Sequence, residues 1–212
     1  MYDVNVHYET AGAFIYQNGY FPFMFGPDNA QTAHGVVRLG GHREPHEDAW
    51  ACAFREIVEE AQMTTSFLDA PLTYYMENEQ ATPIVYDHPI HADIQPLLLA
   101  GNLAAPQSVM FLGSALEEPS PSSETRGILR LSPRDIQAMC ERPVTLREFR
   151  YQADARQILQ VIPLDEDLVL RPYLQLRFLH FLLTERQDLF AELIDALNRQ
   201  GSPVRNPLGN ME

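Results

Sequence analysis

The chain has 212 residues and a formal net charge of -14, with 29 acidic residues and 15 basic residues that are all arginine. The absence of lysine excludes a lysine Schiff base and a P-loop lysine as catalytic devices. A sequence pI near 4.8 argues against general nucleic-acid binding, because phosphate neutralisation needs a basic surface. The carboxylates are therefore solvated, paired, or gathered around a cation.

The remaining composition is that of a soluble globular protein, with 45% hydrophobic and 21% charged residues. Cys52 and Cys140 are far apart in sequence, so we expect reduced thiols and no disulfide framework. The first nine residues include Asp3, His7 and Glu9 and no apolar run. This predicts no signal peptide and a cytoplasmic location. No apolar stretch is long enough for a membrane span.

Periodicity and turn residues predict the elements of the first half of the chain. In chain order they are a hairpin over 12–25 that turns near Asn18-Gly19, a strand over 36–39 that stops at Gly40-Gly41, a helix over 48–62, and a strand over 72–76. The segment 81–107 contains four prolines and no clear period. We interpret it as a long insertion with one short helix around 94–99.

The second half is predicted in the same way. It gives a strand over 108–112, a loop over 117–124, a strand over 128–131, and a helix from Pro133 to about Cys140, capped by Ser132. Apolar residues then dominate 167–199, and the later part repeats at three and four residues, which is typical of an amphipathic helix. We therefore divide the chain into a domain over 1–165 and a C-terminal helical extension over 166–212. The extension either closes the core or forms a homodimer contact.

The chemically informative residues lie on the helix predicted over 48–62. Glu56, Glu59 and Glu60 share one helical face at i, i+3 and i+4, where like charges destabilise a helix. A hard divalent cation would resolve this conflict, because Mg²⁺ prefers carboxylate and carbonyl oxygens. The alternative is a solvated acidic helix, in which Arg55 pairs with a neighbouring glutamate. Gly40 and Gly41, which precede the loop before this helix, allow a backbone carbonyl to turn inward.

The spacing of these residues resembles the Nudix box, G-x5-E-x7-R-E-U-x-E-E-x-G-U, in which U is aliphatic. The matching residues are Gly41, Glu47, Arg55, Glu56, Ile57, Glu59, Glu60 and Met63. Gln62 departs from the pattern, because the box has its second glycine there. A non-glycine residue in a left-handed turn would be strained by about 1 kcal/mol, or the turn would differ.

The resemblance implies an α+β fold, in which a mixed sheet lies between helices in an α/β/α sandwich. It also implies Mg²⁺-dependent hydrolysis of a pyrophosphate linkage in a small nucleotide-type substrate, with Mn²⁺ as a substitute metal. By the resemblance, Glu56, Glu59, Glu60 and the Gly40 carbonyl are metal ligands, and Glu56 is alternatively the base that activates water. Arg55 orients Glu56, and Glu47 pairs with Arg55.

Further site residues are suggested outside the box. Many members of the family carry another catalytic carboxylate before a late strand, and Glu124 is our candidate, followed by Glu118 and Glu117. Arg38 and Arg43 flank the glycine turn and could bind a substrate phosphate or form surface ion pairs. Two other functions stay open: a non-catalytic nucleotide-binding sensor on the same scaffold, and an interaction module whose acidic helix is only solvated.

Overall fold

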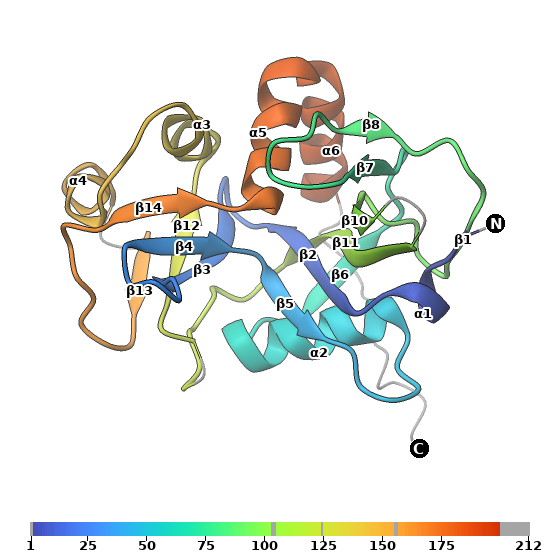
Figure 1. Ribbon diagram of the computed structural model, residues 1–212, viewed down its shortest axis with the longest axis horizontal. Helices are drawn as coiled ribbons and strands as arrows, with labels where there is room; N and C mark the ends of the chain where they lie inside the picture. Colours follow the sequence, from blue (N-terminus) through green and yellow to red (C-terminus); the bar gives the residue numbers. More distant parts are fainter. Residues whose placement is uncertain (1, 103–104, 124, 155–156, 200–212) are drawn as a thin grey trace.

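The computed structural model describes residues 2–102, 105–123, 125–154 and 157–199 (Figure 1). The helices are α1 (Val4–His7), α2 (Ala49–Ala61), α3 (Pro133–Glu141), α4 (Leu146–Gln152), α5 (Leu174–Glu185) and α6 (Gln187–Arg199). The strands are β1 (Tyr2–Asp3), β2 (Thr10–Tyr16), β3 (Phe21–Pro27), β4 (Ala33–Val37), β5 (Leu39–His42), β6 (Thr65–Leu68), β7 (Tyr74–Met76), β8 (Ile84–Val85), β9 (Ile90–His91), β10 (Leu98–Asn102), β11 (Ala105–Ala115), β12 (Gly127–Leu131), β13 (Ile158–Gln160) and β14 (Val169–Pro172). The fold is α+β, as the sequence predicts.

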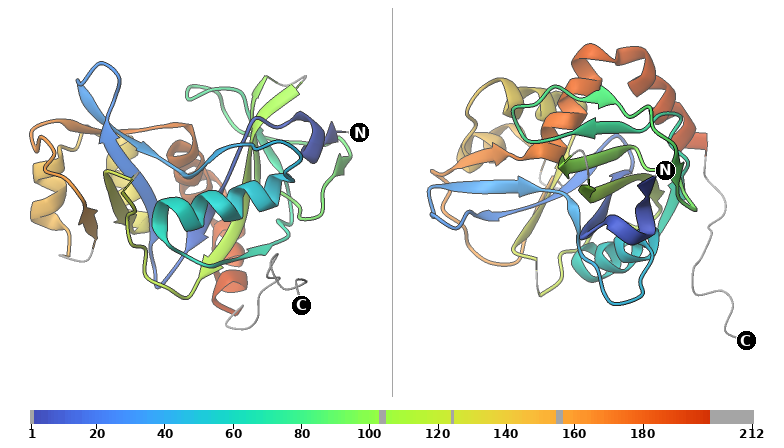
Figure 2. Two further views of the ribbon diagram at one scale, coloured as in Figure 1. Left: turned by 90° about the horizontal axis from the view of Figure 1, so that it is seen from below. Right: turned by 45° about the vertical axis from the view of Figure 1, so that its right-hand side comes forward.

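A mixed seven-stranded sheet forms the centre of the molecule, in the order β5-β2-β11-β10-β7-β8, with β6 also paired to β11. Helix α2 lies on one face of this sheet, and α5 and α6 lie on the other (Figure 2). The alternation of β11 explains this arrangement, because Val109 and Phe111 face α2 whereas Met110 and Leu112 face α5. The alternation of apolar residues along β11 therefore accounts for helices covering both faces of the sheet.

A second, five-stranded sheet has the order β13-β12-β3-β4-β14. Its inner face carries apolar residues of β3 and β12, such as Phe23 and Leu129, which pack in the same core as α3 and α5. The predicted turn at Asn18-Gly19 is present, with Gln17 bridged to Tyr20. The two strands of this hairpin then separate, and β2 enters the seven-stranded sheet while β3 enters the five-stranded sheet.

Helix α2 packs through a face of small residues. Cys52, Ala53 and Ala61 are fully buried together with Ile57, so the helix approaches the sheet closely and leaves its carboxylates outside the core. The helix ends at Gln62, which adopts the left-handed conformation (φ 54°, ψ 35°) and donates its backbone N–H to the Val58 carbonyl over 3.0 Å. Although Gln62 replaces the glycine of the box, the left-handed helix cap is still formed. A side chain other than glycine is disfavoured in this conformation.

Several elements differ from the sequence-based expectation. The helix expected around 94–99 is wrong: this segment leads into β10, which lies between β7 and β11. The apolar run of β10 is that of a central strand buried on both faces, a pattern that periodicity cannot distinguish from a buried helix. The apolar segment after Asp167 begins with a strand, β14, and then forms two helices that separate at Arg186. No helix in the described part of the chain has the length and apolar character of a membrane span.

Candidate metal centre and active site

The site is built around the two glycines of β5. Gly40 has a φ of +133°, and a Cβ there would lie 2.3 Å from the Ala11 carbonyl oxygen. A Cβ at Gly41 would lie 2.2 Å from Oε2 of Glu56. Gly40 therefore requires glycine because of its backbone conformation, whereas a side chain at Gly41 would displace the Glu56 carboxylate. The two glycines of β5 and the acidic face of α2 are in direct contact.

Glu60 connects α2 to Gly40 on β5. Its Oε2 accepts a hydrogen bond from the Gly40 N–H at 2.7 Å. Burial raises the pKa of the Glu60 carboxyl to about 8, and the charge of Glu56 adds to the rise, while the Gly40 N–H opposes it. The ionised form of Glu60 thus lacks sufficient positive charge around it. A cation bound here would supply that charge.

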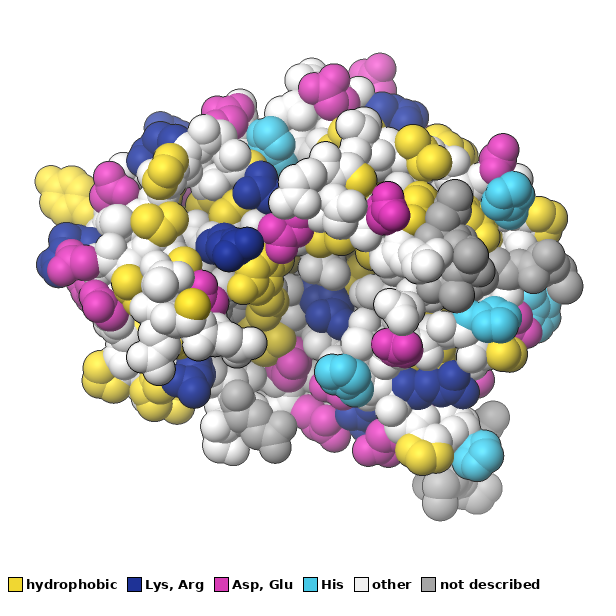
Figure 3. Space-filling view, viewed as in Figure 1, with side chains coloured by type: hydrophobic (Ala, Val, Ile, Leu, Met, Phe, Trp, Pro, Cys, Tyr) yellow, Lys and Arg dark blue, Asp and Glu magenta, His cyan; other side chains and the backbone are white. Residues whose placement is uncertain are grey.

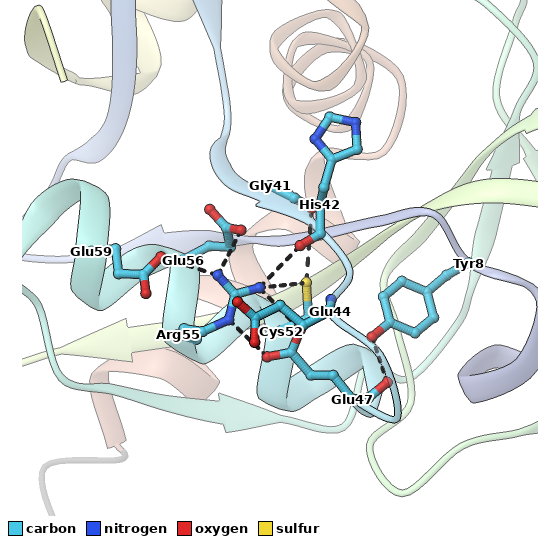
Figure 4. Close-up of polar contacts among 9 residues, drawn as sticks. All are labelled: Tyr8, Gly41, His42, Glu44, Glu47, Cys52, Arg55, Glu56 and Glu59. Carbon is cyan, nitrogen blue, oxygen red and sulfur yellow. Dashed lines mark hydrogen bonds and ion pairs between the residues drawn. The ribbon is translucent and has the colours of Figure 1, made fainter. Parts of the chain in front are cut away.

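Arg55 organises the remaining carboxylates (Figure 4). Its guanidinium donates two hydrogen bonds to Glu47, at 2.9 and 3.0 Å, and others to Glu56 at 2.8 Å and Glu59 at 3.0 Å. A fifth bond, at 3.0 Å, reaches the His42 carbonyl at the end of β5. The hydrogen bonds with Glu47 are the main reason that the pKa of Arg55 rises above its ordinary value. Arg55 therefore fixes the loop, the helix and two candidate ligands in one network.

The donor set fits a hard divalent cation. The donors are carboxylate oxygens on one helical face, beside the two glycines of β5. Mg²⁺ and Mn²⁺ prefer such oxygen ligands. The space that Gly41 leaves for the Glu56 carboxylate is a further fit, since a Cβ would fill it. In the described residues, however, no three acidic, histidine or cysteine side chains are gathered closely enough to hold a metal. Glu56 and Glu59 are instead bonded to Arg55, so metal binding would require them to turn from the guanidinium.

The two candidate phosphate-binding arginines differ in their surroundings. Arg38 extends over Gly12, and its Nε is buried without a hydrogen-bond partner among the described residues. Burial lowers the pKa of Arg38, while the charges of Glu60 and Glu56 counteract the effect. Arg43, in contrast, contacts the Val6 carbonyl at 3.2 Å and lies over the ring of Tyr8. Only Arg38 is therefore placed at the acidic cluster with bonding capacity left over.

Figure 3 shows how charged side chains are distributed over one face of the molecule. A hollow in the middle of the front face has an arginine at its bottom and acidic side chains along its lower edge. A concave surface that combines both signs of charge suits a metal-bound anion, because the cation and the arginine attract the anion where carboxylates alone would repel it.

The loop before β12 is fastened to the end of α2. Backbone and hydroxyl donors of this loop bind the last carbonyls of the helix: the Ser120 N–H reaches Ala61 at 2.8 Å, and the Thr125 hydroxyl reaches Glu60 at 2.9 Å. Sequence reasoning missed this connection, for which the sequence contains no local signal. Glu124, our candidate for an additional carboxylate, lies outside the described residues.

The other two acids of the loop have partners away from the cluster. Glu117 accepts a hydrogen bond from the Thr64 N–H at 3.2 Å, just beyond the end of α2. Glu118 forms an ion pair with Arg130, which is otherwise buried on β12. Both contacts tie the loop to the body of the protein, so neither acid is at present directed toward Glu56 or Glu60.

Comparison with known proteins finds similar folds. Solved structures similar to the chain include a Nudix hydrolase from Nitrosomonas europaea, at 13% identity and a TM-score of 0.39, over 59% of this chain and 57% of that one. A hydrolase of the Nudix family from Clostridium perfringens is 15% identical with a TM-score of 0.44, over 62% and 85%. A putative Nudix hydrolase family member from Chromobacterium violaceum is 13% identical with a TM-score of 0.35, over 90% and 96%.

No family model matches the chain, and no curated protein matches it. The solved structures named above are all at or below 15% identity to the chain, with TM-scores of 0.44 or less. They are likenesses of fold at low identity. What the chain does is therefore argued from its own residues.

Proposed function

We propose that the chain is a Nudix-type hydrolase that depends on Mg²⁺ or Mn²⁺ and cleaves a pyrophosphate linkage in a small nucleotide-type substrate. The observation that carries the proposal is the convergence of Glu56 and Glu60 on the two glycines of β5. One carboxylate occupies the space of a Cβ at Gly41, and the other binds the Gly40 N–H. A purely solvated acidic helix would have no reason to direct two carboxylates at this strand.

In this proposal the residues of α2 hold the cation and prepare the water for attack. Glu56, Glu59 and Glu60 would hold the metal with the Gly40 carbonyl, and the metal would neutralise bridging oxygens and lower the pKa of water. Glu56 accepts the proton of the attacking water when it is not itself a ligand. In the metal-free site Arg55 holds Glu56 and Glu59 through its hydrogen bonds, and both would turn from the guanidinium to bind the metal. Arg38 would bind a phosphate oxygen through its guanidinium, whose buried Nε has no hydrogen-bond partner among the described residues.

The test is a substrate panel with Mg²⁺ and with Mn²⁺, consisting of ADP-ribose, dinucleoside polyphosphates, NADH and nucleoside triphosphates. We expect turnover of at least one compound, and a loss of kcat of about a hundredfold or more for Glu59→Gln, since one charged ligand is removed. Glu192→Gln is the matched control, because Glu192 is an exposed glutamate on another helix. No product from any compound would contradict the proposal.

The same panel separates the alternative function. A non-catalytic nucleotide-binding sensor would bind a compound of the panel tightly without turnover, and Glu60→Gln would leave its affinity unchanged. An interaction module would neither bind these compounds nor bind Mg²⁺ at α2. Calorimetric titration of the wild-type chain and of Glu60→Gln with Mg²⁺ distinguishes these two cases.

A further inference from the structure

A cavity of about 410 Å³ lies on the outer face of the five-stranded sheet, the face turned away from the core. This volume is typical of sites for small molecules. The lining comes from three separate parts of the chain. They are the neighbouring strands β3 and β4 with the turn between them, the residues just before β12, and Tyr173 at the start of α5.

Two glycines make room for the side chains of Tyr173 and Arg126 that line the cavity. Gly26 on β3 and Gly35 on β4 lie directly opposite each other in the sheet register. A Cβ at Gly35 would lie 2.8 Å from the Tyr173 ring, and a Cβ at Gly26 would lie 3.1 Å from Cδ of Arg126. The two side chains therefore rest against bare backbone, on adjacent strands and at the same level. Any other residue at Gly35 would displace the ring.

The lining combines planar and hydrogen-bonding groups. The phenol of Tyr173, over whose ring the Arg171 guanidinium lies at 5.5 Å, and the guanidinium of Arg126 are planar groups of the kind on which heterocyclic rings stack. Arg126 is exposed and has no ion pair with any other described residue. At the rim, Asp28 accepts hydrogen bonds from the backbone of Thr32 and Ala33, and these lower the pKa of its carboxyl, so that it stays an ionised acceptor.

The cavity adjoins the carboxylate cluster. Thr125 lines the cavity, and its hydroxyl binds the carbonyl of Glu60, whose side chain reaches Gly40. Val37, another lining residue, directly precedes Arg38, the arginine with unpaired bonding capacity. The cavity is thus joined to the end of α2 through Thr125, and a diphosphate on a ligand seated there would extend toward the acidic face of this helix.

From this geometry we infer that the cavity binds the heterocyclic end of the substrate, a nucleobase with ring or amino N–H donors, and that Tyr173 and Arg126 determine specificity. The inference rests on the proposed function and adds the position and chemistry of base recognition. It also assigns a role to the C-terminal segment, because Tyr173 comes from the region that follows β14 and lies far from the box in sequence.

The test uses nucleosides, which have no phosphate, and the metal-free full chain, so that neither a metal nor a phosphate contributes to the binding measured. Saturation-transfer NMR and titration with adenosine, guanosine, cytidine and uridine give the affinity of each base. We expect one or two of them to bind, and Tyr173→Leu and Arg126→Ala to weaken this binding about tenfold each. Tyr173→Phe should retain the affinity, because it keeps the ring.

The matched controls are Tyr151→Leu and Arg134→Ala. Tyr151 is a tyrosine with 92% exposure on α4, and Arg134 is an exposed arginine on α3. Neither should change nucleoside binding. The inference is overturned if no nucleoside binds, or if Tyr173→Leu and Arg126→Ala both bind as well as the wild type. Arg126→Ala alters an exposed side chain, so its effect can be measured even if Tyr173→Leu does not fold.

The failures of the two proposals can be told apart. Nucleoside binding that depends on Tyr173, without hydrolysis of any compound in the panel, would support the cavity and contradict the hydrolase. Hydrolysis at equal rates for substrates with different bases, without nucleoside binding, would support the hydrolase and contradict the assigned cavity.

Discussion

The buried carboxyl of Glu60 makes the stability of the metal-free protein dependent on pH. Its pKa rises from 4.5 to about 8 on folding, chiefly through burial. Between these values the folded state holds a proton that the unfolded state has lost, so the free energy of unfolding falls as the pH rises. Below pH 4.5 both states are protonated and the effect is absent. Above about pH 8 both states are ionised, and the full decrease in the free energy of unfolding remains.

The size of the effect follows from the same values. At ~1.4 kcal/mol per pH unit, the rise from 4.5 to about 8 corresponds to about 5 kcal/mol. Glu60→Gln removes the titrating group and keeps an oxygen that can accept the Gly40 N–H. We therefore expect the wild type to lose about 5 kcal/mol relative to Glu60→Gln between about pH 4 and pH 9.

Urea unfolding in the presence of a chelator, followed by the fluorescence of the single Trp50, measures this difference. Comparing the two proteins at each pH cancels the titration of all groups that they share. Mg²⁺ at about pH 9 should then stabilise the wild type much more than the variant, because it binds the ionised carboxylate. A constant difference between wild type and variant across this range would refute the reasoning about Glu60.

Three further substitutions test the site. Gln62→Gly should stabilise the protein by about 1 kcal/mol in urea unfolding, because glycine relieves the left-handed cap; an unchanged or lower midpoint would contradict this. Gly41→Ala should abolish Mg²⁺-dependent turnover while circular dichroism shows a folded chain, since the Cβ displaces the Glu56 carboxylate; full activity would be incompatible with that contact. Arg55→Lys should lower kcat at least tenfold, because lysine cannot form the paired bonds to Glu47; coupling near zero in a cycle with Glu47→Gln would argue against a shared network.

Sequence reasoning worked best where a side-chain pattern and its backbone are local. The helix predicted over 48–62 is α2, and the predicted pairing of Arg55 with Glu47 is present as two hydrogen bonds. It failed where long-range pairing decides the structure. The apolar residues of β10 become a strand because β7 and β11 flank it, and those partners are distant in sequence.

The base cavity illustrates a second limit. Gly26 and Gly35 look like ordinary turn and strand glycines in sequence, and only the register of β3 with β4 places them side by side. The positions of Arg126 and Tyr173 depend on two further strands, β12 and β14, which join the same sheet from opposite sides. No local pattern contains this information, since it arises from pairings across most of the chain.

The parallel pairing of β14 with β4 has a consequence for the order of folding. Ala33 and Val169 are register partners, about 140 residues apart, so closing this pair costs much chain entropy and is expected late. The contacts between α2 and β5 join neighbouring segments and can form early. During refolding, Mg²⁺-dependent stabilisation should therefore return before nucleoside binding, and simultaneous recovery in stopped-flow experiments would contradict this order. The proposed recognition of the base is thus expected late in refolding, after the metal site has formed.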